Sequence, residues 1–251
     1  MRNTFLCAPA TLLVLIAGSV LAQAPPDWTG FYTLASPRDL MGTGLKQDAP
    51  GEALNKLITP YLQPWAKARM EATDGVADDT GQVCLPDGIF RYPSMAGRFV
   101  WLQEHDRIVM AFQNINTAGV RRLYLNRPHP KNPIPTWNGD SIAHWDGDTL
   151  LVDSVGFNDK SWLFGGMQPH TEEAHLIERM KMVANGAILN INITVEDRHA
   201  LTSAYSYNRF YKRQPAGVEM PEDVCNEDPD TWKQFRDEKL NKLIEKSRIV
   251  K

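Results

Sequence analysis

The sequence predicts an all-β protein, an eight- to nine-stranded antiparallel up-and-down barrel with short N- and C-terminal helices. Between residues 97 and 212, short segments alternate apolar and polar side chains, which is the pattern of half-buried strands. Turn sequences rich in Asn, Asp and Gly separate these segments, and such turns join antiparallel neighbours. Successive strands with short links close into a barrel or a strongly curled sheet.

The first 22 residues have the parts of a cleaved signal peptide. Arg2 supplies the positive charge, an apolar stretch centred on residues 12–16 follows, and Val20-Leu21-Ala22 presents small side chains where a signal peptidase reads. The apolar stretch is too short for a spanning helix, and no later run is long enough. We expect an exported protein, periplasmic or secreted, without an integral membrane segment after cleavage. A buried N-terminal helix is the alternative.

These patterns divide the chain into four parts. Residues 1–22 are the signal peptide, 23–96 an N-terminal extension with short helices and a loop, 97–212 the barrel, and 213–251 a C-terminal loop and amphipathic helix. In the extension, the aromatic stretch at 28–32 predicts a first strand. Residues 51–72 have helical spacing, and Pro60 and Pro64 divide them into two short helices because an interior proline removes a backbone donor.

The barrel region contains eight expected strands. They lie near 97–103, 107–114, 119–125, 139–145, 148–155, 174–184, 187–196 and 201–212. The two longest connections, 126–138 and 156–173, are the expected place for a site or a lid, because binding groups concentrate on long loops. The tail from Asp228 to Lys251 has a capped amphipathic pattern, and we expect it to pack across the sheet or one barrel mouth.

Charge and cysteine content narrow the class of protein. The formal net charge is −3, and loss of Arg2 with the signal peptide makes it about −4, so nucleic acid is a poor partner. Cys84 and Cys225 remain after cleavage. In an oxidising compartment such a pair is more often a disulfide than a metal or redox site. Two separate buried thiols are the alternative.

The Asn185-Gly186 turn fixes the register of the hairpin around it. The odd-numbered positions from 189 to 195 are then buried, and Glu178 of the preceding strand points to the same face. A carboxylate among aliphatic side chains needs a partner or a raised pKa. Glu178 is therefore a candidate general acid or base, or a ligand anchor. The alternative is a structural salt bridge to an inward arginine such as Arg209.

The Asp146-Gly147 turn gives a second set of candidates. It places Asp140 opposite Asp153, with His144 on the same face. Two facing carboxylates repel unless they share a proton or a cation, and a nearby histidine can serve as base or proton carrier. The opposite face is apolar. The alternative is therefore that the acidic face is solvent-exposed and that Asp140 belongs to turn chemistry.

Aromatic side chains gather near the long connections and in the last strand. Trp137, Trp145, Tyr205 and Tyr207 are candidate ligand-binding residues, because such rings line pockets for apolar or aromatic molecules. The alternative is that these rings are ordinary core, since a barrel needs large side chains to fill it.

Familiar catalytic and cofactor patterns are missing from the sequence. There is no GxSxG elbow, P-loop, GxGxxG or CxxC. His170 and His175, with Glu172 and Glu173 between them, do not match a zinc spacing. His129 lies in a proline-rich loop. We expect no metal and no cofactor.

Three segments resemble a widespread family of exported bacterial proteins, mostly hypothetical, with the pattern G-x-S-x-G-x-W-E-G-D-T-L-V-V-D-T. They are Cys84-Leu85-Pro86-Asp87-Gly88, residues 139–153 (GDSIAHWDGDTLLVD) and Val224-Cys225-Asn226-Glu227. Ala143, Asp146 and Ser154 depart from the pattern. The resemblance implies export and a shared fold, but no reaction. Residues 28–32 are also loosely similar to the Gly-x-Trp start of lipocalins, which implies a lipocalin-like barrel.

Taken together, these patterns favour an exported barrel that encloses a small apolar or aromatic molecule, with Glu178 and the tyrosines as polar anchors. The alternative is a cofactor-independent enzyme of lyase or isomerase type, in which Glu178, His144, Asp153 or Asp140 performs acid–base chemistry. A third alternative is an envelope interaction protein. Glu178→Gln would change only affinity in a binder, but rate in an enzyme.

Overall fold

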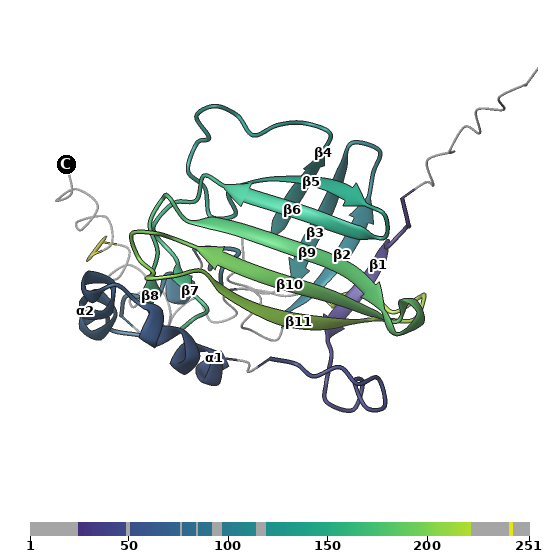
Figure 1. Cartoon of the computed structure of the whole chain (residues 1–251), viewed down its shortest axis with the longest axis horizontal. Coiled ribbons are helices and arrows are strands. Elements are labelled where there is room, and N and C mark those ends of the chain that lie inside the picture. Colours follow the sequence, from purple (N-terminus) through teal and green to yellow (C-terminus); the bar gives the residue numbers. More distant parts are fainter. Residues whose placement is uncertain are drawn as a thin grey trace, which may run out of the picture.

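The computed structural model describes residues 25–48, 51–75, 77–83, 85–91, 97–113, 119–221 and 241–242. Within them, nine strands form a closed barrel in the order β1-β11-β10-β9-β6-β5-β4-β3-β2 (Figure 1). The barrel strands are β1 (Gly30–Leu34), β2 (Arg98–Gln103), β3 (Arg107–Gln113), β4 (Val120–Leu125), β5 (Asp140–Asp146), β6 (Thr149–Val155), β9 (His175–Val183), β10 (Ile188–Glu196) and β11 (Tyr205–Arg213).

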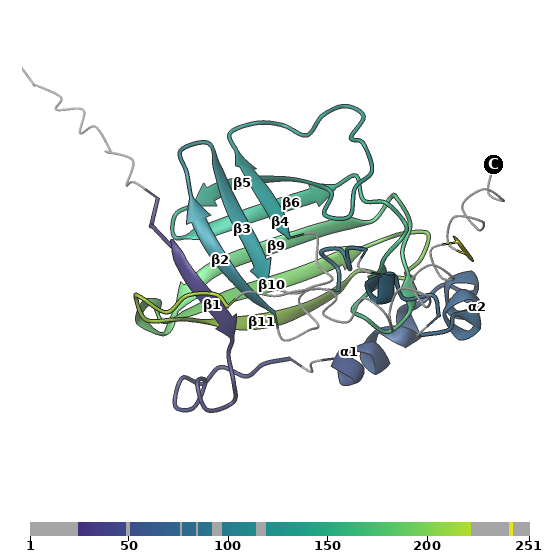
Figure 2. The same ribbon diagram turned by 180° about the vertical axis from the view of Figure 1, so that it is seen from behind.

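The helices gather at one end of the barrel. α1 (Gly51–Ile58) and α2 (Pro64–Ala72) lie there beside the two-stranded sheet of β7 (Trp162–Leu163) and β8 (Gln168–Pro169) (Figures 1 and 2). We call this the helix-bearing end; β11 begins there. Pro64 starts α2 at a position where its missing N–H has no helical partner to lose, so the predicted division into two short helices is confirmed.

The all-β barrel expected from the sequence is confirmed, but the sheet is mixed rather than purely antiparallel. β4 and β5 run parallel, with Leu123 paired to Ser141. A closed ring of nine strands cannot alternate in direction all the way round, because alternation closes only for an even number. The parallel pair needs a long connection, and residues 126–139 supply it by returning the chain to the other end of the barrel. We call this connection the crossover.

Most strand boundaries agree with the sequence pattern to within one residue. Two strands are exceptions: β1 is Gly30–Leu34 instead of 28–32, and the last strand begins at Tyr205 instead of 201. Asp197 accounts for the later start of β11. Its carboxylate accepts the backbone N–H groups of His199 and Ala200 at 3.0 Å each, and this holds the preceding residues in a turn.

Inward-facing side chains fill the barrel. Near its middle, the ring of Tyr32 stacks on that of Phe99 with centroids 5.3 Å apart, and Phe99 meets Tyr211 edge-on at 5.1 Å. Where β1 begins, Trp28 packs on Trp145 with centroids 4.7 Å apart. The end of the barrel where β1 begins, opposite the helix-bearing end, is therefore packed with aromatic side chains.

Several predictions fall on residues outside the described ranges. They are the signal peptide, the cysteine pair and nearly all of the C-terminal helix. Signal cleavage and the disulfide between Cys84 and Cys225 stay predictions. Of the helices in the described ranges, none has the length and apolar character needed to cross a membrane.

Candidate functional site

Glu178 points into the barrel, as the hairpin register predicts. β9 pairs with β10 so that Glu178 lies opposite Ile193, and only 2% of Glu178 is exposed. The predicted register of the Asn185-Gly186 hairpin is therefore confirmed. A carboxylate at this depth requires compensation of its charge.

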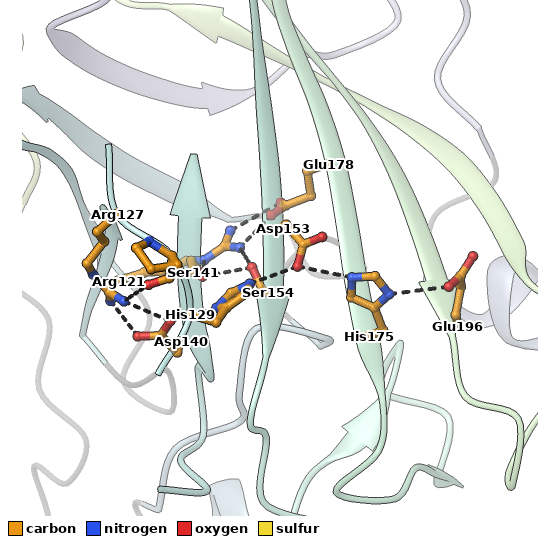
Figure 3. Close-up of polar contacts among 11 residues, drawn as sticks. Arg121, Arg127, His129, Asp140, Ser141, Asp153, Ser154, His175, Glu178 and Glu196 are labelled. Carbon is orange, nitrogen blue, oxygen red and sulfur yellow. Dashed lines mark hydrogen bonds and ion pairs between the residues drawn. The ribbon is translucent and has the colours of Figure 1, made fainter. Parts of the chain in front are cut away.

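That compensation comes from Arg121 of β4 rather than from Arg209. Arg121 Nη1 donates to Glu178 Oε1 at 3.1 Å, and Nη2 donates to Oε2 at 2.5 Å. Arg121 Nε also donates to Ser141 Oγ at 3.2 Å, and Nη2 to Ser154 Oγ at 3.0 Å (Figure 3). We call these four residues the interior network. Its two-pronged ion pair and serine contacts are the geometry that makes a buried pair tolerable.

Arg209 faces the interior but has different contacts. Its Nη1 donates to the carbonyl oxygens of Asp48 and Asn208 at 3.0 Å each, and its guanidinium lies 4.8 Å from the ring centroid of Tyr207. The sequence-based alternative of a salt bridge for Glu178 is thus confirmed with another arginine as partner.

On the outer face, Asp140 and Asp153 are not opposite each other, so the expected register is wrong there. Asp140 pairs with Val155, two residues further along β6. The turn lies one position later than expected, on Gly147-Asp148, and Gly147 has the positive φ of +61° that such a turn demands. A shift of two residues keeps every side chain on its predicted face, so the two aspartates still share the outer surface.

His129 of the crossover connects these aspartates. Its Nδ1 lies 2.7 Å from Asp140 Oδ1, and its Nε2 lies 2.9 Å from Asp153 Oδ1. His175 continues the line, with Nε2 3.1 Å from the same Asp153 oxygen and Nδ1 3.3 Å from Glu196 Oε2 (Figure 3). We call Asp140, His129, Asp153, His175 and Glu196 the outer chain.

Each imidazole of the outer chain lies between two carboxylates. Both ring nitrogens of His129 face carboxylate oxygens, and a neutral imidazole has only one N–H to donate. His175 has the same arrangement, although its buried Nε2 has the distance but not the direction of a hydrogen bond to Asp153.

Arg127 reinforces one end of the outer chain. Its Nη1 and Nη2 donate to the two carboxylate oxygens of Asp140 at 3.2 and 2.5 Å, and its guanidinium lies 3.9 Å from the ring centroid of Tyr124. Burial alone would raise the pKa of Asp140. The hydrogen bonds from Arg127 and His129 outweigh burial and lower that pKa.

The interior network and the outer chain share two strands. On β5, Asp140 faces out and Ser141 faces in; on β6, Asp153 faces out and Ser154 faces in. His144, also predicted as an acid–base group, is exposed on β5. Sequence reasoning missed His129 and His175 as partners of the aspartates, because the path of the crossover cannot be read from strand alternation.

The predicted ligand-binding residues do not form one cluster. Tyr205 and Tyr207 are neighbours with ring centroids 6.2 Å apart. Trp145 packs on Trp28 near the start of β1, which is the other end of the barrel. Trp137 is half-buried in the crossover. Tyr205 and Tyr207 are therefore the two that can act together.

A third polar cluster lies ahead of β2. Arg91 Nη1 is 2.7 Å from Asp79 Oδ1 and 2.7 Å from Asp87 Oδ1, although the contact with Asp87 lacks hydrogen-bond direction. One guanidinium thus serves two buried carboxylates. Burial raises the pKa of Asp87 to about 7; Arg91 offsets this in part, and the charge of Asp79 adds to it.

We expect Asp87 to make the free energy of unfolding fall as pH rises. Its pKa is about 7 in the fold against an ordinary 3.8, so the folded state holds the proton more tightly. The stabilising contribution is complete below the ordinary value and is lost as pH rises through about 7. In urea unfolding, the free energy of unfolding of Asp87→Asn should rise relative to that of the parent between pH 4 and pH 8, by up to about 4 kcal/mol. Parallel pH profiles for the two proteins would contradict this, and Asp106→Asn, at an exposed turn, is the control.

The sequence matches no protein-family model, and a search of curated proteins finds no significant match. In the described ranges, no group of three or more His, Cys, Asp or Glu side chains is arranged to hold a metal ion. Fold and site together define the class of this chain: a closed nine-stranded β-barrel protein with charged groups both inside the barrel and in a line on its outer face.

Proposed function

We propose that this barrel binds a small molecule with an apolar or aromatic body at the helix-bearing end. The observation that carries the proposal is a series of four rings, Tyr61, Tyr205, Phe164 and Tyr207, which we call the ring series. Centroid distances are 5.4 Å for Tyr61 and Tyr205, 6.2 Å for Tyr205 and Tyr207, and 5.2 Å for Phe164 and Tyr207. Exposure falls from 36% at Tyr61 to 2% at Tyr207, so the rings lead from the surface inward.

The inner end of the ring series lies beside charged groups. Burial is the main cause of the raised pKa of Tyr207, Arg209 opposes it, and the charge of Glu178 adds to it. A flat ligand can replace one of the edge-to-face ring contacts, because each such contact contributes only about 0.5–1.5 kcal/mol beyond the area that it buries. The hydroxyls of Tyr205 and Tyr207 then offer polar anchors, with Glu178 deeper in the barrel.

The interior network supports the same proposal from its energetics. A buried ion pair seldom adds stability over apolar side chains of similar size. Arg121 and Glu178 are therefore better explained by a role in recognition than by folding. The proposed setting is the periplasm or the extracellular medium, on the signal-peptide pattern of residues 1–22.

The experiment uses N-phenyl-1-naphthylamine, a neutral aromatic probe whose fluorescence rises in an apolar site. The parent should bind it saturably, and Tyr205→Ala should raise its Kd by about tenfold or more. Tyr124→Ala is the matched control, since Tyr124 lies on β4 against Arg127 and outside the ring series. No saturable binding by the parent, or equal weakening by both variants, would overturn the proposal.

The second candidate function is a cofactor-independent lyase or isomerase. The outer chain favours it, because alternating carboxylates and imidazoles are the groups that move protons in acid–base catalysis. Compounds recovered from natively purified protein would be incubated with the parent, with Glu178→Gln and with His129→Gln. Turnover that falls about 100-fold in a folded variant would identify an enzyme. Changed affinity without turnover would leave the binding function.

A further inference from the structure

An exposed apolar line runs along the helices. Leu57, Tyr61 and Trp65 are 51%, 36% and 43% exposed, and each lies four residues after the last. They lie in turn on α1, on the 3-10 turn that follows it (Thr59–Tyr61) and on α2, which starts after two residues of extended backbone at Leu62 and Gln63. We call these three residues the exposed stripe. The adjacent line is buried against the barrel; it consists of Leu54, Ile58, Leu62 and Ala66.

We propose that the exposed stripe is the docking face for the C-terminal segment of this same chain, residues 228–251. The first reason is the position at which the chain leaves the barrel after β11. The carbonyl of Pro221 accepts a hydrogen bond from Gln113 Nε2 at 2.8 Å. Gln113 ends β3, and the alternating directions of β11, β1, β2 and β3 place that point at the helix-bearing end.

The second reason is reach. From Pro221 to Trp232, the first aromatic residue of the segment, an extended chain of 11 residues spans at most about 36–40 Å. The combined length of α1 and α2 is only about 26 Å at 1.5 Å per residue. The connection from Pro221 to Trp232 is therefore longer than the two helices that carry most of the exposed stripe.

The third reason is complementarity. The segment carries Trp232, Phe235, Leu240 and Leu243 at helical spacing, which is the apolar face that a helical docking surface takes. Asn241 and Lys242, between two of these residues, are helical and exposed, as the polar side of such a helix requires.

Charge favours the same pairing. Residues 222–238 contain seven acidic and two basic side chains. On α2, the exposed Arg69 continues the line of the stripe four residues after Trp65, and Lys67 is exposed beside it. The acidic residues 222–238 and the basic side chains at one end of the stripe carry opposite charges, and this attraction would orient the docking.

The experiment places the photocrosslinker p-benzoyl-phenylalanine at position 57 of the full mature chain. Irradiation should join position 57 to a peptide from 228–251 of the same chain, identified by mass spectrometry. The probe at position 102 is the control, because Leu102 is 44% exposed on β2 but lies near the end where β1 begins. Position 65 is the second probe site should the first variant fold poorly.

Two further variants sharpen the result. Trp232→Ala with Phe235→Ala should lower the crosslink yield several-fold, whereas Lys242→Ala should leave it unchanged. A crosslinked dimer would assign the stripe to a second copy of the chain and overturn the proposal. No crosslink from position 57 to residues 228–251, or equal yields from positions 57 and 102, would overturn it as well.

Discussion

Arg121→Met should lower the free energy of unfolding by about 3–5 kcal/mol, because it leaves Glu178 as an uncompensated charge inside the barrel. Arg121 and Glu178 are each only 2% exposed, so water cannot replace the guanidinium as the partner of the carboxylate. For a domain of this size the melting temperature should fall by roughly 10 °C. Urea unfolding followed by tryptophan fluorescence measures the effect.

The neighbouring arginine provides the matched control. Arg122 is the next residue on β4 and is exposed, so Arg122→Met should change the free energy of unfolding by no more than about 0.5 kcal/mol. The double variant Arg121→Met with Glu178→Leu should recover most of the loss, since it removes both buried charges. Equal losses from Arg121→Met and Arg122→Met would show that the interior ion pair is not formed in solution.

Gly139→Ala should lower the free energy of unfolding by about 3 kcal/mol. Gly139 has φ +66°, and a Cβ there would lie 2.7 Å from the carbonyl oxygen of Val155 and 2.7 Å from Cε1 of Phe157. Phe157 is fully buried and cannot move aside. The methyl group would push the end of the crossover away from β6.

Gly147→Ala separates the crowding from the backbone strain. Gly147 also has a positive φ, +61°, but no heavy atom lies within 4 Å of its would-be Cβ. In that variant, only the strain of a non-glycine backbone at positive φ should lower the free energy of unfolding, by about 1–2 kcal/mol. Thermal and urea unfolding of both variants give the difference. If Gly147→Ala were as destabilising as Gly139→Ala, crowding by Val155 and Phe157 would not be the cause.

The strands were predictable because each one buries a single face. Alternation is a local signal, and it located the barrel strands and the inward direction of Glu178. The parallel pair β4 and β5 was not predictable in this way. A closed ring with an odd number of strands must contain a parallel pair. No local sequence pattern shows that the sheet closes or how many strands it has.

The register of the two hairpins shows the same limit. Asn185-Gly186 offers one tight turn, and the pairing around it is as predicted. The run Asp146-Gly147-Asp148 contains two overlapping turn signals, and the second is the one used. Local turn chemistry cannot choose between them, whereas packing of the whole strand against its neighbours can.

The candidate site was predictable only in part. Asp140 and Asp153 were placed on one face from the parity of their strands, which any even shift preserves. Arg121 was missed because its contact with Glu178 crosses β5 and β6, a distance that depends on barrel curvature. His129 was missed because an irregular crossover has no period from which its position could be deduced.

The parallel pair also determines how the chain could be reconnected. Arg213 at the end of β11 lies beside Tyr32 of β1, so a short linker could join the two natural ends of the barrel. New termini between Lys131 and Asn132, both exposed in the crossover, would then leave every strand pairing in place. In that circular permutant every covalent link between barrel neighbours joins antiparallel strands. The one parallel strand pair of the barrel, β4 with β5, then joins the last strand of the permuted chain to its first.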